Sequence, residues 1–241
     1  MLFVGVGPAR LFVAAEAREF SGLLPFCGKV ARLDWPLAWA RVAELNGRKV
    51  FLAANGAGPN LASEAIVIAR SNIGQEGMDA VVSTGFCGGL DPAMKIGDVF
   101  AATSIEMEGG LAAVSVPQSH REFFKGTLVS RDRVAQTAEE KRDLRRSGAS
   151  AVDMEAAGVL SRVREWGVPF YCVRSVTDLA EESFHIDLNS ARSADGRFST
   201  ARILAEAIRR PVTIAPELLE LRRRCAIAAQ SLGEFIAHCS F

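Results

Sequence analysis

The sequence lacks the marks of several large protein classes. Its 28 lysines and arginines are balanced by 28 aspartates and glutamates, whereas proteins that bind nucleic acid or an anionic membrane usually carry a basic surplus. Three histidines and five cysteines without a CxxC pair form no recognisable metal-ligand spacing. The apolar start, residues 1–7, is too short to span a bilayer and lacks a basic region. We therefore expect no nucleic-acid partner, no metal and no integral membrane contact.

The cysteines also indicate a compartment. They are scattered and odd in number, and Cys87 and Cys172 have apolar neighbours. This pattern is typical of reduced, buried thiols in a cytoplasmic protein. No internal repeat, low-complexity tract or linker rich in proline and serine interrupts the chain. We expect a single domain that spans residues 1–241.

Short apolar runs alternate with amphipathic stretches along the chain. The apolar runs predict strands at residues 11–15, 39–45, 49–54, 80–83, 98–103, 111–116 and 169–176. The amphipathic stretches predict helices at residues 16–24, 61–70, 136–146, 155–166 and 216–237. Asn46-Gly47 predicts a hairpin, so the sheet should be mixed. Several strands are apolar on both faces, which indicates an α/β domain whose central sheet is covered on both sides.

Ligands of such sheets collect at the carboxyl ends of the strands. Three predicted loops lie there, at residues 56–60, 85–89 and 177–179. The glycine-rich stretch 84–89 either lets the backbone approach a flat or anionic ligand or forms a turn that only packs. The segment 5–10 breaks the dinucleotide fingerprint, because Arg10 stands in place of its last glycine. An oxidoreductase with a nicotinamide cofactor is therefore disfavoured.

Two acidic motifs carry candidate chemistry. Asp153-Met154-Glu155 stands at a strand-to-helix junction, where an acid either complements the helix dipole or grips a diol such as that of ribose. Asp178 ends an apolar strand. It either caps the next turn or donates a proton, for which partial burial must raise its pKa.

Four segments occur in a specific order and spacing. They read VAAE at 13–16, STGFCGGL at 83–90 with KIGDV at 95–99, VDMEA at 152–156, and VPFYCVRSVTD at 168–178. Together they resemble the nucleoside phosphorylase/nucleosidase superfamily, in particular its methylthioadenosine/S-adenosylhomocysteine nucleosidases and their relatives. The resemblance implies a three-layer α/β/α sandwich with a central mixed β-sheet, assembled as a homodimer or larger homo-oligomer. It also implies a small-molecule nucleoside as substrate and no metal or organic cofactor.

In this family an acid protonates N7 of a purine, so that the nucleobase departs and a ribosyl oxocarbenium ion forms. Water or phosphate then attacks the anomeric carbon of the sugar. The resemblance implies that Asp178 is this acid. It places Glu155 on the ribose hydroxyls and Met154 against the ribose carbons. The remaining expected substrate contacts are Gly85 beside the base, Phe86 and Asp153.

The chain departs from the nucleosidase pattern in residues 130–135. This segment is similar to a nucleosidase loop that supplies a stacking aromatic side chain and backbone groups that read adenine. Val134 stands at the position of the aromatic residue. A valine cannot stack on the base as an aromatic ring does, so the sequence does not decide whether the enzyme is specific for adenine.

A second departure follows the first strand, where nucleosidases carry the glutamate that activates water. Arg18 stands there, unless a shift of register brings in Glu16 or Glu19. A guanidinium suits phosphate as a co-substrate and cannot act as a base, although it is equally typical of a solvated residue that pairs with a nearby acid. Ser83 and Phe86 stand where many phosphorylases bind phosphate through arginine and serine.

We therefore expect cleavage of the N-glycosidic bond of a purine nucleoside, with adenine as the favoured base and with or without a 5′ substituent. Phosphorolysis is slightly favoured over hydrolysis. This mixed pattern also resembles hopanoid-associated phosphorylases, whose nucleoside is thought to be lipid-linked. A non-catalytic nucleoside-binding relative of the same fold is the alternative. The presence of both Glu155 and Asp178 argues against it, because binding alone requires no acid at N7.

Overall fold

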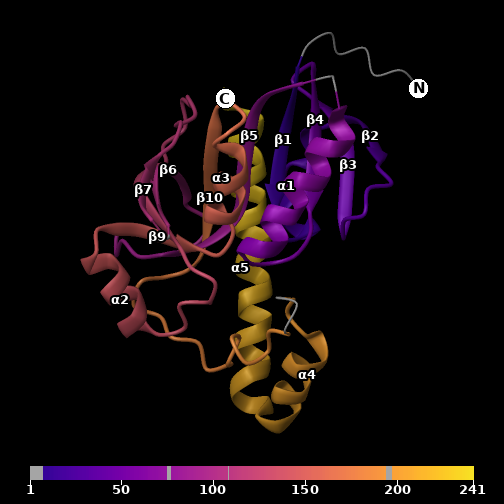
Figure 1. Cartoon of the computed structure of the whole chain (residues 1–241). Coiled ribbons are helices and arrows are strands. Elements are labelled where there is room, and N and C mark those ends of the chain that lie inside the picture. The colour runs from indigo at the N-terminus through magenta and orange to yellow at the C-terminus, as the bar shows by residue number, and fades with distance from the viewer. Residues whose placement is uncertain (1–7, 75–76, 108, 194–196) are drawn as a thin grey trace.

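The alternation of strands and helices expected from the sequence is present in the computed structural model, which describes residues 8–74, 77–107, 109–193 and 197–241 (Figure 1). The apolar start and the first glycines of the broken dinucleotide fingerprint lie outside the described residues. The strands are β1 (Ala9–Ala14), β2 (Gly28–Arg32), β3 (Trp39–Leu45), β4 (Arg48–Ala54), β5 (Met78–Gly89), β6 (Val99–Met107), β7 (Gly110–Ala113), β8 (Phe124–Ser130), β9 (Ala149–Asp153) and β10 (Phe170–Asp178). The α-helices are α1 (Pro59–Ile73), α2 (Ala138–Arg146), α3 (Ala156–Val163), α4 (Thr200–Arg209) and α5 (Pro211–Ala237).

The described strands form one mixed sheet in the order β10-β6-β8-β9-β5-β1-β4-β3-β2, with β7 paired to β6. The hairpin at Asn46-Gly47 is confirmed: it joins the antiparallel strands β3 and β4, and both turn residues have positive φ, as a tight hairpin turn requires. Strand β5 pairs with β10 as well as with β9 and β1. The strands β10, β6, β8, β9 and β5 therefore close into a ring, which the sequence did not predict.

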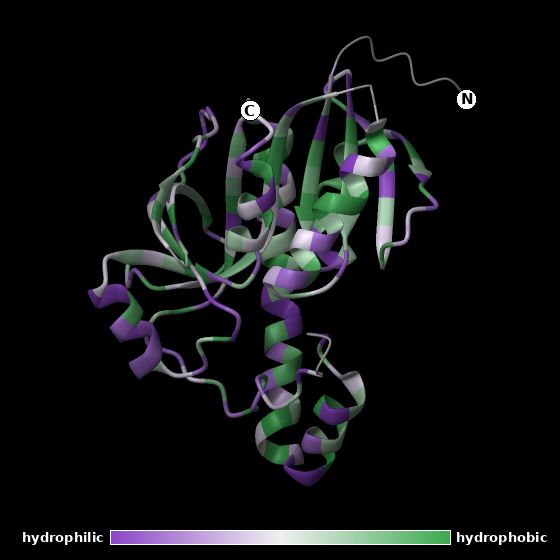
Figure 2. Ribbon diagram, in the orientation of Figure 1, coloured by the Kyte–Doolittle hydropathy of each residue, from purple (hydrophilic) through white to green (hydrophobic). Residues whose placement is uncertain are grey.

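The sheet lies between two helical layers, as the sequence predicted. In β1, Leu11 and Val13 pack in one core cluster with residues of α1 and α3, such as Ile66. Phe12 and Ala14 point to the opposite face and pack with residues of α5. Successive side chains of a strand point to opposite faces, so a strand that is apolar throughout needs cover on both. Figure 2 shows the corresponding hydrophobic colouring in the middle of the sheet.

Two predicted segments take other forms. The glycine-rich stretch 84–89 is not a loop but the second half of β5, because Gly88 and Gly89 pair with β9. Residues 16–24 do not form one helix but contribute to two 3-10 helices, η1 (Ala17–Phe20) and η2 (Leu24–Phe26). Between them, a Cβ on Gly22 would lie 2.0 Å from the carbonyl oxygen of Ala229, so this turn is fitted closely to the backbone of α5.

Three elements were not predicted at all: β2, β8 and α4. Strand β9 was predicted only as the strand of the strand-to-helix junction at Asp153, without bounds. Strand β2 is exposed along its whole length, and α4 has no buried residue in the described part of the chain. Strand β2 does not carry the one-sided apolar pattern on which sequence prediction relies. Helix α4 does have an apolar side, which the sequence analysis missed.

Candidate functional site

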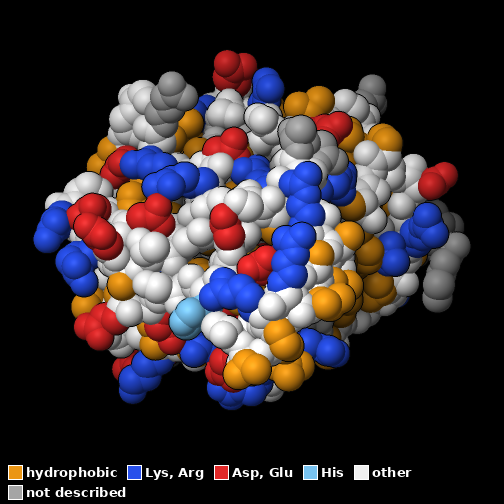
Figure 3. Space-filling view, turned by 90° about the horizontal axis from the view of Figure 1, so that it is seen from below, with side chains coloured by type: hydrophobic (Ala, Val, Ile, Leu, Met, Phe, Trp, Pro, Cys, Tyr) orange, Lys and Arg blue, Asp and Glu red, His pale blue; other side chains and the backbone are white. Residues whose placement is uncertain are grey.

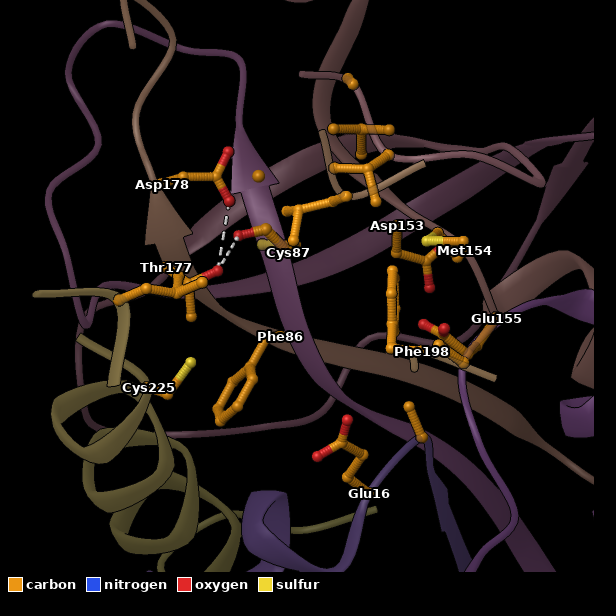
Figure 4. Close-up of a pocket in the computed structure, with 18 of the residues that line it drawn as sticks. Glu16, Phe86, Cys87, Asp153, Met154, Glu155, Thr177, Asp178, Phe198 and Cys225 are labelled. Atoms are coloured by element: carbon orange, nitrogen blue, oxygen red, sulfur yellow. Dashed lines mark hydrogen bonds between the residues drawn. The ribbon is translucent and has the colours of Figure 1, made fainter. Parts of the chain in front are cut away.

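A cavity opens at the carboxyl ends of β1, β5, β9 and β10, where ligands of α/β sheets collect (Figure 4). Its volume of about 190 Å³ limits its ligand to a small molecule. In Figure 4, Asp178 and Glu155 lie on opposite sides of the view, with the rings of Phe86 and Phe198 between them. The residues of the predicted site that line it are Glu16, Arg18, Phe86, Val134, Asp153, Met154, Glu155 and Asp178.

Strand β5 brings the two acidic motifs together. Its Val81–Cys87 stretch runs parallel to β10, and its last two residues run antiparallel to β9. Gly88 thus lies between the two motifs: a Cβ there would lie 2.9 Å from Asp178 Oδ1 and 3.0 Å from Val152 Cγ1. Only a glycine leaves room for both neighbours, which explains a glycine at this position of the sequence motif.

Asp178 ends β10 with its side chain at the cavity. Its Oδ1 lies 2.5 Å from Lys141 Nζ. The Thr177 hydroxyl lies 3.2 Å from Asp178 Oδ2 and 3.3 Å from the Cys87 carbonyl oxygen, and it has one proton to donate to either. Burial raises the pKa of Asp178 above its usual value, and the ammonium of Lys141 opposes this rise. A raised pKa is what a proton donor near neutral pH requires.

Lys141 was missed by the sequence analysis, where it is one charge in the charged helix α2. Its side chain is fully buried, and its ammonium also donates to the Leu179 carbonyl oxygen at 2.8 Å. A buried ammonium is unfavourable unless its donors are satisfied and its charge is balanced. Asp178 and Leu179 supply both needs, so α2 is tied to the end of β10 by this lysine.

Glu155 lies at the cavity just before α3, and its Oε1 accepts the backbone N–H of Gly58 at 2.9 Å. Burial, together with the nearby Asp153 carboxylate, raises the pKa of Glu155 to about 8. The neighbouring Met154 presents a buried apolar side chain to the same cavity. The pair thus offers a carboxyl group for hydroxyls and a thioether for carbon.

Asp153 points below the cavity to a fully buried guanidinium. Its Oδ2 accepts from Arg174 Nε at 3.0 Å and Nη2 at 2.5 Å, and from the Ala156 backbone N–H at 2.9 Å. Arg174 Nη2 also donates to Ser83 Oγ at 2.7 Å. The structure therefore uses this oxygen of Asp153 to balance Arg174 and to begin α3. The predicted contact of Asp153 with substrate stays a prediction.

Glu19 was one of three candidates from the sequence, with Glu16 and Arg18, for the residue that acts on the nucleophile. It is buried at the cavity wall, and it accepts the backbone N–H of Glu16 at 2.9 Å and of Phe86 at 3.0 Å. Burial raises the pKa of Glu19, and these two hydrogen bonds oppose the rise. A Cβ on Gly85 would lie 2.7 Å from Glu19 Oε1. Gly85 lies behind Glu19 and is not among the described residues that line the cavity.

Arg18 and Glu16 lie at the cavity edge. Arg18 Nε is 2.7 Å from Glu16 Oε2, and 59% of the Arg18 side chain is exposed. This arrangement is that of a solvated ion pair, whose net stabilisation is small. The predicted anion contact of Arg18 stays a prediction, but the arginine has an acidic partner already.

The segment after β8 is hydrogen-bonded to the stretch of chain between β10 and α4. The Val134 backbone N–H donates to Asn189 Oδ1 at 2.9 Å, and its carbonyl oxygen accepts from Asn189 Nδ2 at 3.0 Å. Phe184, Leu188 and Phe198 from the same stretch line the cavity. No motif marks these residues in the sequence, because their place depends on how residues 179–193 and 197–199 lie at the opening.

A metal cluster and a membrane-spanning helix are both absent from the described residues. No group of three or more His, Cys, Asp and Glu residues in this part of the chain is arranged to hold a metal ion. No helix there combines the length and apolarity that crossing a bilayer needs.

Comparison of the sequence with known protein families identifies the family of this chain. The model of the phosphorylase superfamily matches residues 40–209. The chain belongs to the phosphorylase superfamily. The match covers more than half of the sequence, from β3 to the end of α4, and the resemblance seen in the sequence motifs is confirmed.

Individual members of the phosphorylase superfamily are similar over different lengths. A 5'-methylthioadenosine/S-adenosylhomocysteine nucleosidase of Exiguobacterium is 26% identical over 141 residues. The match covers 46% of this chain and 60% of the length of that relative.

Solved structures match over nearly the whole chain. The futalosine hydrolase of Helicobacter pylori gives a TM-score of 0.67 at 18% identity, covering 95% of each chain. A 5'-methylthioadenosine/S-adenosylhomocysteine nucleosidase of Neisseria meningitidis, in complex with methylthio-immucillin-A, gives a TM-score of 0.65 at 22% identity. It covers 95% of this chain and 98% of that chain. At these identities the two matches show a shared fold.

Proposed function

We propose that this member of the phosphorylase superfamily hydrolyses the N-glycosidic bond of a purine nucleoside. The observation that carries the proposal is the enclosure of Glu19, Glu155 and Asp178 in one cavity, each with a pKa raised first of all by burial. Titratable groups perturbed in this way gather at catalytic sites. The similarity to a named nucleosidase over part of the chain supports the same reaction.

Asp178 is the general acid of the proposed reaction. A protonated carboxyl group at this place gives its proton to N7 of the purine as the bond to the sugar breaks. Glu155 binds the ribose hydroxyls, and Met154 packs on the sugar carbons. The diol donates two hydrogen bonds to Glu155, which favours the ionised form of a group whose pKa is about 8 in the free protein.

Glu19 is the base that activates water. It is buried, it is held by two backbone N–H groups, and its raised pKa suits proton uptake near neutral pH. Arg18 is largely exposed and paired with Glu16. These contacts favour hydrolysis over the phosphorolysis that the sequence slightly favoured, because a phosphate site needs free donors and positive charge.

The walls of the cavity suggest which nucleoside it takes. Leu221 and Cys225 form apolar lining on the side of α5. We propose that this side receives an apolar 5′ substituent. The name of the Exiguobacterium relative, a methylthioadenosine nucleosidase, supports the choice of a thioether as the first substrate to try. Enclosed catalytic acids argue against a purely binding relative, since burying them costs folding free energy.

The test is a product assay with purified protein. Adenosine, 5′-methylthioadenosine and inosine are each incubated with and without phosphate in ¹⁸O-labelled water. We expect release of base and a free pentose carrying ¹⁸O, at a rate that phosphate does not change. Formation of the sugar 1-phosphate would overturn hydrolysis in favour of phosphorolysis. Failure to release base from any purine nucleoside would overturn the enzymatic proposal itself.

A pair of neighbouring variants separates the two nucleophiles. Glu19→Gln should lower kcat roughly 10²–10⁴-fold, the usual share of acid–base catalysis. Arg18→Ala is the matched control one residue away, and it should leave turnover within a few-fold of wild type. Should Arg18→Ala instead raise the apparent KM for phosphate, the anion site predicted from the sequence exists after all.

A further inference from the structure

Helix α4 and the start of α5 leave an apolar surface without a partner in the described part of the chain. None of the ten residues of α4 is buried, although Leu204 and Ile208 belong to its apolar side. Leu204 is 55% exposed and Ile208 is 78% exposed. Val212, three residues after the end of α4, is 88% exposed. Large apolar side chains exposed in a group usually mark a surface that binds something.

This surface stands off from the rest of the molecule. Figure 1 shows α4 and the first turns of α5 projecting away from the sheet. Arg210 has a non-helical backbone conformation, so the chain turns there from one helix into the other. We call residues 208–212 the α4–α5 turn; its first and last residues, Ile208 and Val212, are apolar. A projecting turn can enter a soft surface without a clash from the α/β layers behind it.

The charge around the α4–α5 turn is positive. Residues 200–214 contain three arginines and one glutamate, and that glutamate, Glu206, is 3.5 Å from Arg210. Arg209 makes no ion pair with any described residue. Figure 3, which views the molecule from this end, shows hydrophobic side chains beside a row of Lys and Arg side chains. The zero net charge of the whole chain conceals this local excess.

We propose that the α4–α5 turn docks on the surface of an anionic phospholipid membrane. Apolar side chains at the end of a helix enter the headgroup region, while flanking arginines bind lipid phosphates. A second copy of the chain fits less well: a two-fold interface centred on this turn would bring Arg209 and Arg210 against their own copies. The docking is peripheral, and it does not depend on the reaction proposed for the cavity.

Flotation with lipid vesicles tests the docking. Full-length protein is mixed with vesicles of phosphatidylcholine alone or with about one quarter phosphatidylglycerol, at low and high salt. We expect the protein to float with the anionic vesicles and to bind them less at high salt, because salt screens the arginines. Ile208→Glu/Val212→Glu should lower the partition coefficient at least roughly tenfold, since two aliphatic side chains no longer enter the lipid.

Two further variants make the outcome specific. Arg209→Gln/Arg210→Gln should weaken binding to anionic vesicles and remove its salt dependence. Leu111→Glu is the matched control, because Leu111 on β7 is 64% exposed but lies outside the α4–α5 turn, and it should bind as wild type does. Equal loss in the control, or no flotation of the wild type, would overturn the proposal. So would a change from dimer to monomer in Ile208→Glu/Val212→Glu with vesicle binding intact, since the surface would then be a contact between copies.

Discussion

At the scale of single residues, two opposing effects meet at Asp178. Its burial favours the protonated carboxyl group, whereas Lys141 Nζ at 2.5 Å favours the carboxylate. Burial is the larger of the two. For the reaction proposed above, we expect the lysine to moderate the acid: it keeps the pKa of Asp178 from rising so far that the proton is held too strongly to be given to the leaving base.

This balance makes a prediction about pH. If the enzyme needs Asp178 protonated, kcat/KM falls as pH rises through the pKa of Asp178. Lys141→Met removes the attraction that lowers this pKa, so the alkaline limb of the profile should move to higher pH. Asp178→Asn should lower kcat roughly 10²–10⁴-fold and abolish the limb. Initial rates between pH 5 and 10 measure both effects.

Lys125→Met serves as the control, because Lys125 is an exposed lysine on β8. A lysine of purely structural importance would lower the rate or the melting temperature without moving the limb. An unmoved limb in a folded Lys141→Met protein would therefore contradict the moderating role.

The sequence identified some of these residues and not others for a physical reason. Glu155 and Asp178 stand in compact motifs next to the ends of strands, so local spacing is enough to point to them. Glu19 was one of three candidates, because only burial distinguishes it from Glu16 and Arg18. Lys141 could not be found, since its contact depends on where α2 lies against β10. A buried lysine looks like a surface lysine in a sequence of charged residues.

At the scale of elements, helices α1 and α3 cross in direct backbone contact. A Cβ on Gly158 of α3 would lie 2.2 Å from the carbonyl oxygen of Pro59, the first residue of α1. The adjoining residue Gly58 donates its N–H to Glu155. The close crossing of two helices thus sets the distance between the loop before α1 and a carboxyl group of the cavity.

Gly158→Ala tests this crossing. Alanine favours a helix by up to about 1 kcal/mol over glycine, yet we expect the variant to be less stable by about 1–3 kcal/mol, because backbone cannot move aside as a side chain can. Gly28→Ala is the control, since a Cβ on Gly28 meets nothing within 4 Å. Thermal unfolding of both variants gives the comparison. A Gly158→Ala protein as stable as wild type would show that the two helices can separate at little cost.

Elements were predictable where a continuous apolar run marks them; β8 lies inside the sheet but has only a short apolar run at its end, and it was missed. The apolar strand β10 was found nearly to the residue, because burial on both faces leaves a continuous apolar run. Strand β5 was cut short at Ser83, since three glycines in six residues are typical of a loop. They are part of a strand here because β5 pairs with β9 and β10, and a Cβ would meet Glu19 at Gly85, Asp178 and Val152 at Gly88, and Val176 at Gly89.

At the scale of the whole molecule, the three enclosed acids set an unusual pH dependence of stability. Glu19, Glu155 and Asp178 each have a raised pKa in the folded chain. The folded state therefore binds more protons than the unfolded state above the ordinary pKa of these groups. The stability that they contribute is complete below that pKa and is lost as pH rises to the folded value, which is about 8 for Glu155.

We accordingly expect the free energy of unfolding to fall between about pH 5 and pH 8, by at most about 1.4 kcal/mol per pH unit for each group. Urea unfolding at three pH values in this range measures the slope. Glu155→Gln removes one of the titrations and should show a shallower slope. A free energy of unfolding that stays level or increases over this range would refute the assignment of raised pKa values. A single-domain chain and a homo-oligomeric assembly stay predictions from the sequence at this scale.

Helix α5 links distant parts of the molecule by its length. Its 27 residues span about 40 Å, from the α4–α5 turn, past Leu221 and Cys225 at the cavity, to Phe235 in the core. Pro216 lies between the turn and the cavity, where the missing backbone N–H makes a helix easiest to bend. The missing hydrogen bond makes the connection between the outer end of α5 and the cavity wall less stiff than an uninterrupted helix of the same length would be.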